Sequence, residues 1–155
     1  MELTIEQALH QGVTAHNAGN LHEAERLYKA ILQSQPKHPD ASHNLGLIVI
    51  LAYQIETALT LFKTALDANP NIEQFWLSYI DALLKAKRLK DAKHAITKAK
   101  KKGFDTKKLE VLLSQSKDLI VSKVTLQAQV KTLQENYQNG RFDDAEKLAM
   151  SITHE

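Results

Sequence analysis

Small and large apolar residues recur along the chain with a period of 34 residues. Alanine recurs at Ala24, Ala58 and Ala92, large apolar residues recur at Tyr28, Phe62 and Ile96, and a third apolar position is formed by Ile31, Ala65 and Ala99. A fixed period of this length is typical of stacked supersecondary units, none of which can bury its apolar face alone. The pattern predicts three units, 5–38, 39–72 and 73–106, each made of two antiparallel helices.

Glycine and proline residues recur with the same period. Gly12 and Gly46 fall 34 residues apart, and we expect them to let the first helix of a unit approach Ala24 or Ala58 in the second helix. Pro36 and Pro70 also fall 34 residues apart, where each second helix should stop, because proline lacks the amide donor. Gly103 replaces that ending in the third unit and suits a left-handed C-cap.

Polar residues mark the expected helix starts. Two pairs have capping-box spacing, and two single residues are good caps at further starts. The predicted caps are Thr4 with Gln7, Asn71 with Gln74, Asn20, and Asp40.

These residues together resemble the tetratricopeptide repeat family. The resemblance covers 5–106 and returns at 126–155, where Tyr137 to Glu146 look like a turn and a second helix. It implies an all-α fold, a right-handed α-solenoid of antiparallel helix pairs. In the family, the first helices line a concave face that binds a protein or peptide.

A connecting segment at 107–125 interrupts the array, because Ala145 follows Ala92 by 53 residues instead of 34. Apolar residues at helical spacing continue through it. One interpretation is a single long helix with a coiled-coil-like seam. The other, which we favour because stacking is what the other units do, is two helices broken near 120–125 and packed on the third unit. The partial fourth unit, 126–155, ends before a polar capping helix, so we expect a fragment of a longer protein.

The resemblance places a set of side chains on the concave face. They are Glu6, Leu9, Val13, His16, Asn17, His43, Asn44, Leu47, Ile50, Leu51, Leu77, Ser78, Asp81, Leu84 and Lys85. An apolar middle with polar rims suits an extended peptide or an amphipathic helix. The alternative is that Leu47, Ile50 and Leu51 pack against neighbouring units or another copy.

Asn44 has a special place in this set. In repeats that resemble those of O-linked N-acetylglucosamine transferases, an asparagine here hydrogen-bonds the peptide backbone, to which an amide can both donate and accept. His10 and Ser78 stand at the corresponding positions, so only one clear asparagine is present. A clamp for chaperone tails needs basic groups at several groove positions. This chain has Leu9, Val13, Gln74 and Ser78 there, so we do not expect a clamp of this type.

Basic residues gather between Lys85 and Lys108, with eleven Lys or Arg against two acids. The candidate basic patch is Lys87, Arg88, Lys98, Lys100, Lys101 and Lys102. An anionic partner is one interpretation. The other, which we favour, is a solvated helix face whose lysines interact with a helix C-terminus. Nucleic acid is disfavoured because Phe104 is the only aromatic residue in this stretch.

The remaining composition excludes several kinds of site. No cysteine is present, and the histidine spacings do not place two imidazoles on one helix face, so we expect neither metal nor cofactor. No phosphate loop or nucleophile motif appears, so we expect no catalytic residue in this chain. The longest apolar stretch, Leu45 to Tyr53, is far shorter than the ~20 residues of a membrane span, and no signal peptide is recognisable. A soluble cytoplasmic protein is expected.

Three functions follow from this sequence. The first is a non-enzymatic module that binds a protein or peptide. The second is the N-terminal substrate-positioning region of a larger enzyme, because the organisation resembles the start of bacterial repeat-bearing glycosyltransferases or sulfotransferases. The third is self-assembly as a homo-oligomer, through Leu148 and Ile152 on the uncapped C-terminal face or through the helix at 109–137.

Overall fold

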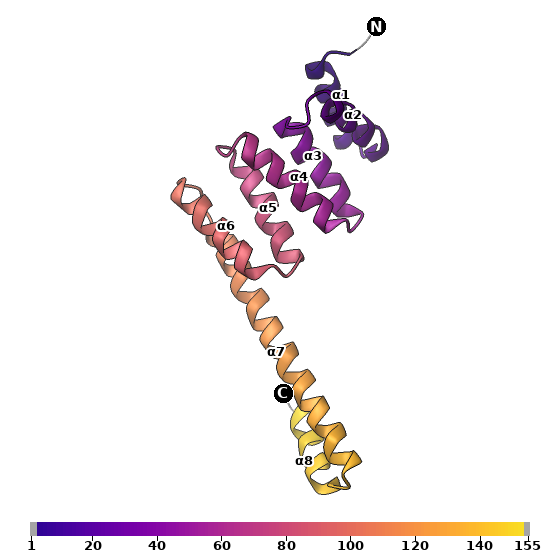
Figure 1. Cartoon of the computed structure of the whole chain (residues 1–155), viewed down its shortest axis with the longest axis vertical. Helices are drawn as coiled ribbons and strands as arrows, with labels where there is room; N and C mark the ends of the chain where they lie inside the picture. The colour runs from indigo at the N-terminus through magenta and orange to yellow at the C-terminus, as the bar shows by residue number, and fades with distance from the viewer. Residues whose placement is uncertain (1–2, 154–155) are drawn as a thin grey trace. The chain divides into compact units, whose positions relative to one another are not determined.

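The computed structural model describes residues 3–153, and all regular secondary structure in that range is α-helical (Figure 1). The chain divides into two compact units, Met1–Leu113 and Ser114–Glu155. The predicted fold class, an all-α solenoid of antiparallel helix pairs, is confirmed. Within residues 3–153, no helix combines the length and the apolar content that crossing a bilayer requires.

Six helices form the repeats of the first unit, one pair in each 34-residue range. They are α1 (Ile5–Asn17), α2 (Leu21–Ser34), α3 (Pro39–Leu51), α4 (Ile55–Ala68), α5 (Glu73–Lys85) and α6 (Leu89–Lys101). Each helix from α1 to α6 contacts the next one along the chain. Among the first helices of the pairs, α1 also contacts α3, and α3 contacts α5. One apolar core therefore runs through all three pairs.

Two of the predicted helix caps are confirmed. Thr4 and Gln7 form a full capping box: Gln7 N donates to Thr4 Oγ1 at 3.2 Å, and Thr4 N donates to Gln7 Oε1 at 3.0 Å. Asn20 Oδ1 accepts from the backbone N–H of Glu23 at 3.3 Å. These side chains satisfy amide groups that have no partner within the helix.

The other two predicted caps are wrong by one or two residues. Helix α3 begins at Pro39, so His38 is the N-cap, and its Nδ1 accepts from Ala41 N at 3.3 Å. Proline is favoured at this first position because it has no amide to satisfy, and it moves Asp40 into the first turn. Helix α5 has Ile72 as its N-cap, so Asn71 lies one residue too early.

The atoms nearest to the two helical glycines belong to aromatic rings of the second helices, a contact that the sequence did not single out. A Cβ atom on Gly12 would lie 2.7 Å from Cε1 of Tyr28, and one on Gly46 would lie 2.6 Å from Cε1 of Phe62. Both rings are almost completely buried. The glycine therefore makes the space in which the ring of the second helix packs.

The third pair fills the same space differently. Ile80 and Ile96 stand at the positions of the glycine and the ring, and both are buried in the core. At the end of this pair Gly103 has a φ of 88°, the left-handed geometry predicted for it.

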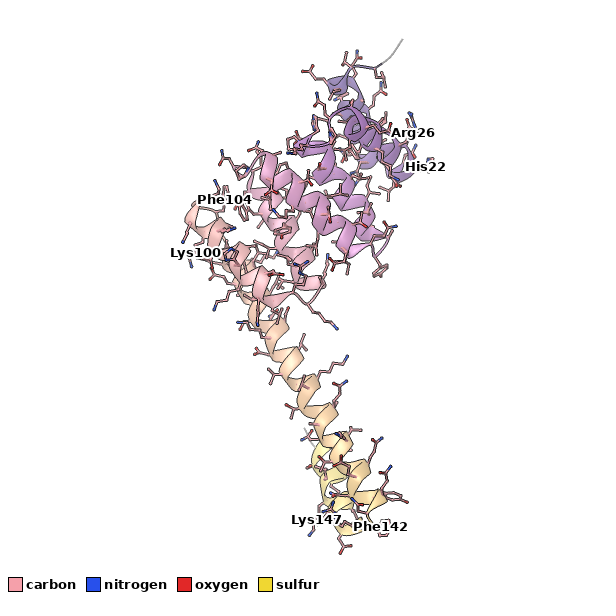
Figure 2. The ribbon with its side chains drawn as sticks, viewed as in Figure 1. His22, Arg26, Lys100, Phe104, Phe142 and Lys147 are labelled. Carbon is pink, nitrogen blue, oxygen red and sulfur yellow. The ribbon has the colours of Figure 1, made fainter. Side chains whose placement is uncertain are left out.

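Helix α7 (Lys107–Gln138) is a single helix of 32 residues. The predicted break near 120–125 is wrong, because β-branched residues disfavour a helix only weakly and no glycine or proline interrupts this segment. Its first turns belong to the core of the first unit, where Leu109 and Leu113 are buried. Lys100, labelled in Figure 2, forms an ion pair with Glu110 at 3.2 Å.

The second unit consists of the rest of α7 and helix α8 (Phe142–Thr153). The rings of Tyr137 and Phe142 meet edge to face, with centroids 5.2 Å apart, and Ala145 is buried. Leu148 and Ile152 are half-buried. Many apolar side chains of this unit are exposed, among them Leu119, Val121, Val124, Leu126, Val130, Tyr137, Phe142 and Met150.

Candidate interaction face

The first helices of the three pairs form one face of the first unit, because α1 contacts α3 and α3 contacts α5. We call this face, formed by α1, α3 and α5, the first-helix face. All fifteen residues predicted for the concave groove lie on these helices. Their position is set by the opposite sides of the same helices, which carry the buried residues Ala8, Gly12, Leu45, Ile80 and Leu83.

Several apolar side chains of α1, α3 and α5 are only partly buried. Half-buried members are Leu9, Leu47, Ile50, Leu77 and Leu84. Leu51 is 63% exposed and Val13 is 37% exposed. These side chains keep part of their apolar surface in water, so a partner that covered them would gain free energy.

The same helices carry polar groups among the residues predicted for the groove. His16 is half-buried, and Glu6 and Asn17 are exposed. Asp81 and Lys85, one turn apart on α5, form an ion pair of 2.6 Å. Both members of the pair are substantially exposed, so it contributes little to stability and leaves both charges near any partner.

His43 is buried between the second and third pairs. Its ring centroid lies 4.7 Å from that of Phe75 and 5.6 Å from that of Phe62. Its Nε2 lies 2.9 Å from Ser78 Oγ, and its Nδ1 lies 3.3 Å from Asn44 Oδ1. Because the amide oxygen can only accept, the proton is on Nδ1, and neutral Nε2 accepts from the Ser78 hydroxyl.

Burial lowers the pKa of His43, and the hydrogen bond that its Nδ1–H donates to Asn44 Oδ1 opposes that shift only in part. The imidazole is therefore held in its neutral form. Of the residues predicted for the groove, the structure brings His43, Asn44 and Ser78 together, with His43 and Ser78 buried and Asn44 half-buried.

The residues of the predicted basic patch do not share one environment. Lys87 lies in the turn before α6 with a φ of 58°. Arg88 forms ion pairs with Asp91 at 2.7 Å and with Glu56 at 3.6 Å. Lys98, Lys101 and Lys102 line a hollow between α4, α5 and α6. Sequence reasoning missed this hollow, although the spacing of these lysines on one side of a helix indicated it.

The part of the chain that the structure describes contains no group of three or more His, Cys, Asp or Glu placed to hold a metal ion.

Residues 54–100, which include α4, α5 and most of α6, match the tetratricopeptide repeat family. No curated protein matches the chain in sequence. Solved structures give the same fold. The TPR2B domain of yeast Sti1, in a complex with pHsp70, is 15% identical, with a TM-score of 0.65 over 74% of this chain and 97% of that one.

Two further structures extend this comparison. MamA (AMB-1) is 18% identical, with a TM-score of 0.65 over 98% of this chain and 73% of that one. The O-GlcNAc transferase of Thermobaculum terrenum is 21% identical, with a TM-score of 0.58 over 66% of this chain. The match spans only 20% of the transferase. The 34-residue period, the helix pairs and these matches lead to one conclusion: residues 54–100 match the tetratricopeptide repeat family, and the chain has the fold of tetratricopeptide repeat proteins.

Proposed function

We propose that the chain is a non-enzymatic interaction module whose first-helix face binds a peptide or protein segment. The observation that carries this proposal is the row of partly exposed apolar side chains along α1, α3 and α5. Leu51, at 63% exposed, and Leu47, half-buried four residues before it on α3, are its most informative members. Apolar side chains between polar ones fit the apolar side of an amphipathic helix or the alternate side chains of an extended peptide.

Precedent in the fold supports the proposal. The structure of the TPR2B domain of yeast Sti1 is a complex with pHsp70, so this architecture can hold a partner of that kind. In our chain, Asn44 adds a polar group beside the apolar row. Its Oδ1 accepts from the Nδ1–H of His43, so the amide is held at a fixed place next to the apolar side chains of α3.

The test uses peptides selected from a random displayed library on the immobilised chain, with affinity measured by fluorescence anisotropy. Leu47→Glu should weaken binding of a selected peptide by about tenfold or more, because it places a charge in an apolar contact. Asn44→Ala should weaken it by a smaller factor. Val121→Glu, an equal change at an exposed residue of α7, is the matched control.

Circular dichroism would establish that each variant keeps its helices. Undiminished affinity in both Leu47→Glu and Asn44→Ala would remove the first-helix face as the binding site.

A second candidate is that the chain positions substrate for a larger glycosyltransferase or sulfotransferase. The similarity to part of the Thermobaculum terrenum enzyme supports it. The full reading frame tests this idea: a catalytic domain after residue 155 would favour it, and a stop codon there would contradict it.

A third candidate is self-assembly through the second unit. Its support is the run of exposed apolar side chains on α7, where Leu119 is 72% exposed. Light scattering after gel filtration should then show a mass that rises with concentration. Leu119→Lys should return the chain to a monomer, whereas Ser122→Lys on the same helix should not. A monomer at every concentration would contradict self-assembly.

A further inference from the structure

A hollow of about 590 Å³ lies among α4, α5 and α6 in the first unit, and its lining includes none of the fifteen residues predicted for the groove. Its base is apolar and includes Leu66, Pro70, Trp76 and Ala95. Trp76 Nε1 donates to the carbonyl oxygen of Pro70 at 2.9 Å, which fixes the indole ring between α5 and the end of the second pair. The base of the hollow is therefore a rigid, preformed apolar surface.

The rim of the hollow carries an excess of positive charge. Two carboxylates are present, and each already has a cation: Lys63 pairs with Asp67 at 2.7 Å, and Arg88 pairs with Asp91 at 2.7 Å. The hydrogen bonds within these pairs raise the pKa of Lys63 and of Arg88. Both cations are thus committed to partners within the chain.

Three lysines on the rim have no such partner. Within residues 3–153, no carboxylate lies at ion-pair distance from Lys98, Lys101 or Lys102, although Lys102 donates to Asn71 Oδ1 at 3.1 Å. The C-terminal dipole of α6 favours lysines at this end of the helix. The dipole does not explain why these three lysines surround an apolar hollow. Lysines around an apolar base point to a ligand that is both anionic and apolar.

We propose that this hollow binds an acidic peptide segment that inserts an apolar side chain against Trp76. Lys98, Lys101 and Lys102 would pair with the carboxylates of the segment. Asp67 and Asp91 on the rim can accept hydrogen bonds from backbone N–H groups, which a peptide has and a nucleic-acid backbone lacks. Trp76 is only 8% exposed, so it offers an edge to a side chain and no open face on which a base could stack.

The single tryptophan of the chain makes this site directly observable. The probe is a short blocked peptide of Glu and Asp residues with one central Leu, titrated against the chain while Trp76 fluorescence is followed. We expect a saturable change in emission. The same peptide with Gln and Asn for its acids, or with Gly for its Leu, should bind more weakly.

Two double variants on α6 distinguish specific binding in the hollow from nonspecific attraction between opposite charges. Lys98→Glu with Lys101→Glu should weaken binding by about tenfold or more. Lys90→Glu with Lys93→Glu makes the same change in net charge on the same helix, outside the hollow, and should alter affinity by less than about twofold. If the charge reversal destabilises α6, Lys98→Gln with Lys101→Gln supplies the comparison, with circular dichroism as the check on folding.

Three results would overturn the proposal. One is the lack of any saturable fluorescence change with the acidic peptide, and another is an equal loss of affinity in the two pairs of lysine variants. The third is a thymidine oligonucleotide of equal charge that binds at least as tightly as the peptide. Because Leu47 lies outside the hollow, Leu47→Glu should leave this titration unchanged, so failure here is distinct from failure of the first-helix face.

Discussion

The Nε2 atom of His43 on α3 lies 2.9 Å from the hydroxyl oxygen of Ser78 on α5, and this hydrogen bond joins the second helix pair to the third. It is a buried polar contact between repeats whose other contacts are mainly apolar. Both groups are shielded from water, so loss of either partner would leave the other unsatisfied.

The neutral state of His43 predicts a pH dependence of stability. Burial lowers its pKa below the ordinary value of 6.5, while Asp40 acts against that shift and His16 acts with it. As the pH falls below 6.5, the unfolded chain binds a proton that the folded chain resists, so the free energy of unfolding decreases. The stabilisation is present above the unfolded pKa and is lost as pH falls through the folded one.

Urea denaturation from about pH 7.5 to 5 would measure this effect. The wild-type protein should lose stability more steeply than His43→Gln over this range. His22→Gln, at an exposed histidine of α2, should keep the wild-type slope. Parallel profiles for wild type and His43→Gln would show that His43 does not cause the dependence.

Gly46→Ala should destabilise the protein, although alanine is more favourable than glycine in an exposed helix by about 1 kcal/mol. The new Cβ would lie 2.6 Å from Cε1 of Phe62, so the core must shift at a cost of about 1–3 kcal/mol. The double variant Gly46→Ala, Phe62→Leu should recover part of the loss relative to the sum of the single changes. Calorimetry would detect this coupling, and strict additivity would count against the ring contact.

Trp76→Phe should lower the free energy of unfolding by about 1 kcal/mol, because it removes the hydrogen bond to the carbonyl of Pro70. Tyr53→Phe, at a residue 89% exposed, should have no measurable effect. Chemical denaturation followed by circular dichroism suits both variants, since the fluorescence of Trp76 is lost in one of them. Equal stability of Trp76→Phe and wild type would mean that the bond contributes nothing.

Two leucines of α7 should respond differently to truncation. Leu113 is 7% exposed in the core of the first unit, and Leu113→Ala should cost about 2–5 kcal/mol. Leu119 is 72% exposed, and Leu119→Ala should change stability by less than about 0.5 kcal/mol. Thermal unfolding of dilute samples would compare them, and similar losses at both positions would contradict the assignment of Leu113 to the core.

The helix pairs could be predicted because sequence period and helix length obey the same geometry. Each first helix of the three pairs has 13 residues, and Gly103 ends the last pair in the predicted conformation. Helix caps were harder, since one proline at position 39 moves the start of α3 and makes His38 the cap. The capping preference of one residue sets the first residue of a helix only when no neighbouring residue, such as a proline, has a stronger preference for that position.

Contacts across helices were the least predictable part. The rings of Tyr28 and Phe62 supply the atoms nearest to Gly12 and Gly46, but the sequence period does not single them out, because Ala24 and Ala58 recur equally well. Periodicity identifies positions on a common face but does not choose the partner within it. The hollow beside Trp76 was missed for the same reason: its lining comes from three helices of two repeats.

The alternation between a glycine with a ring and a pair of isoleucines constrains how the repeats can diverge. For the second repeat to acquire the arrangement of the third, Phe62 must be replaced before Gly46. The reverse order passes through an intermediate in which a Cβ atom and the ring compete for one space. Neutral drift in this array is therefore directional: the ring position can vary first, and the glycine becomes free to change only afterwards.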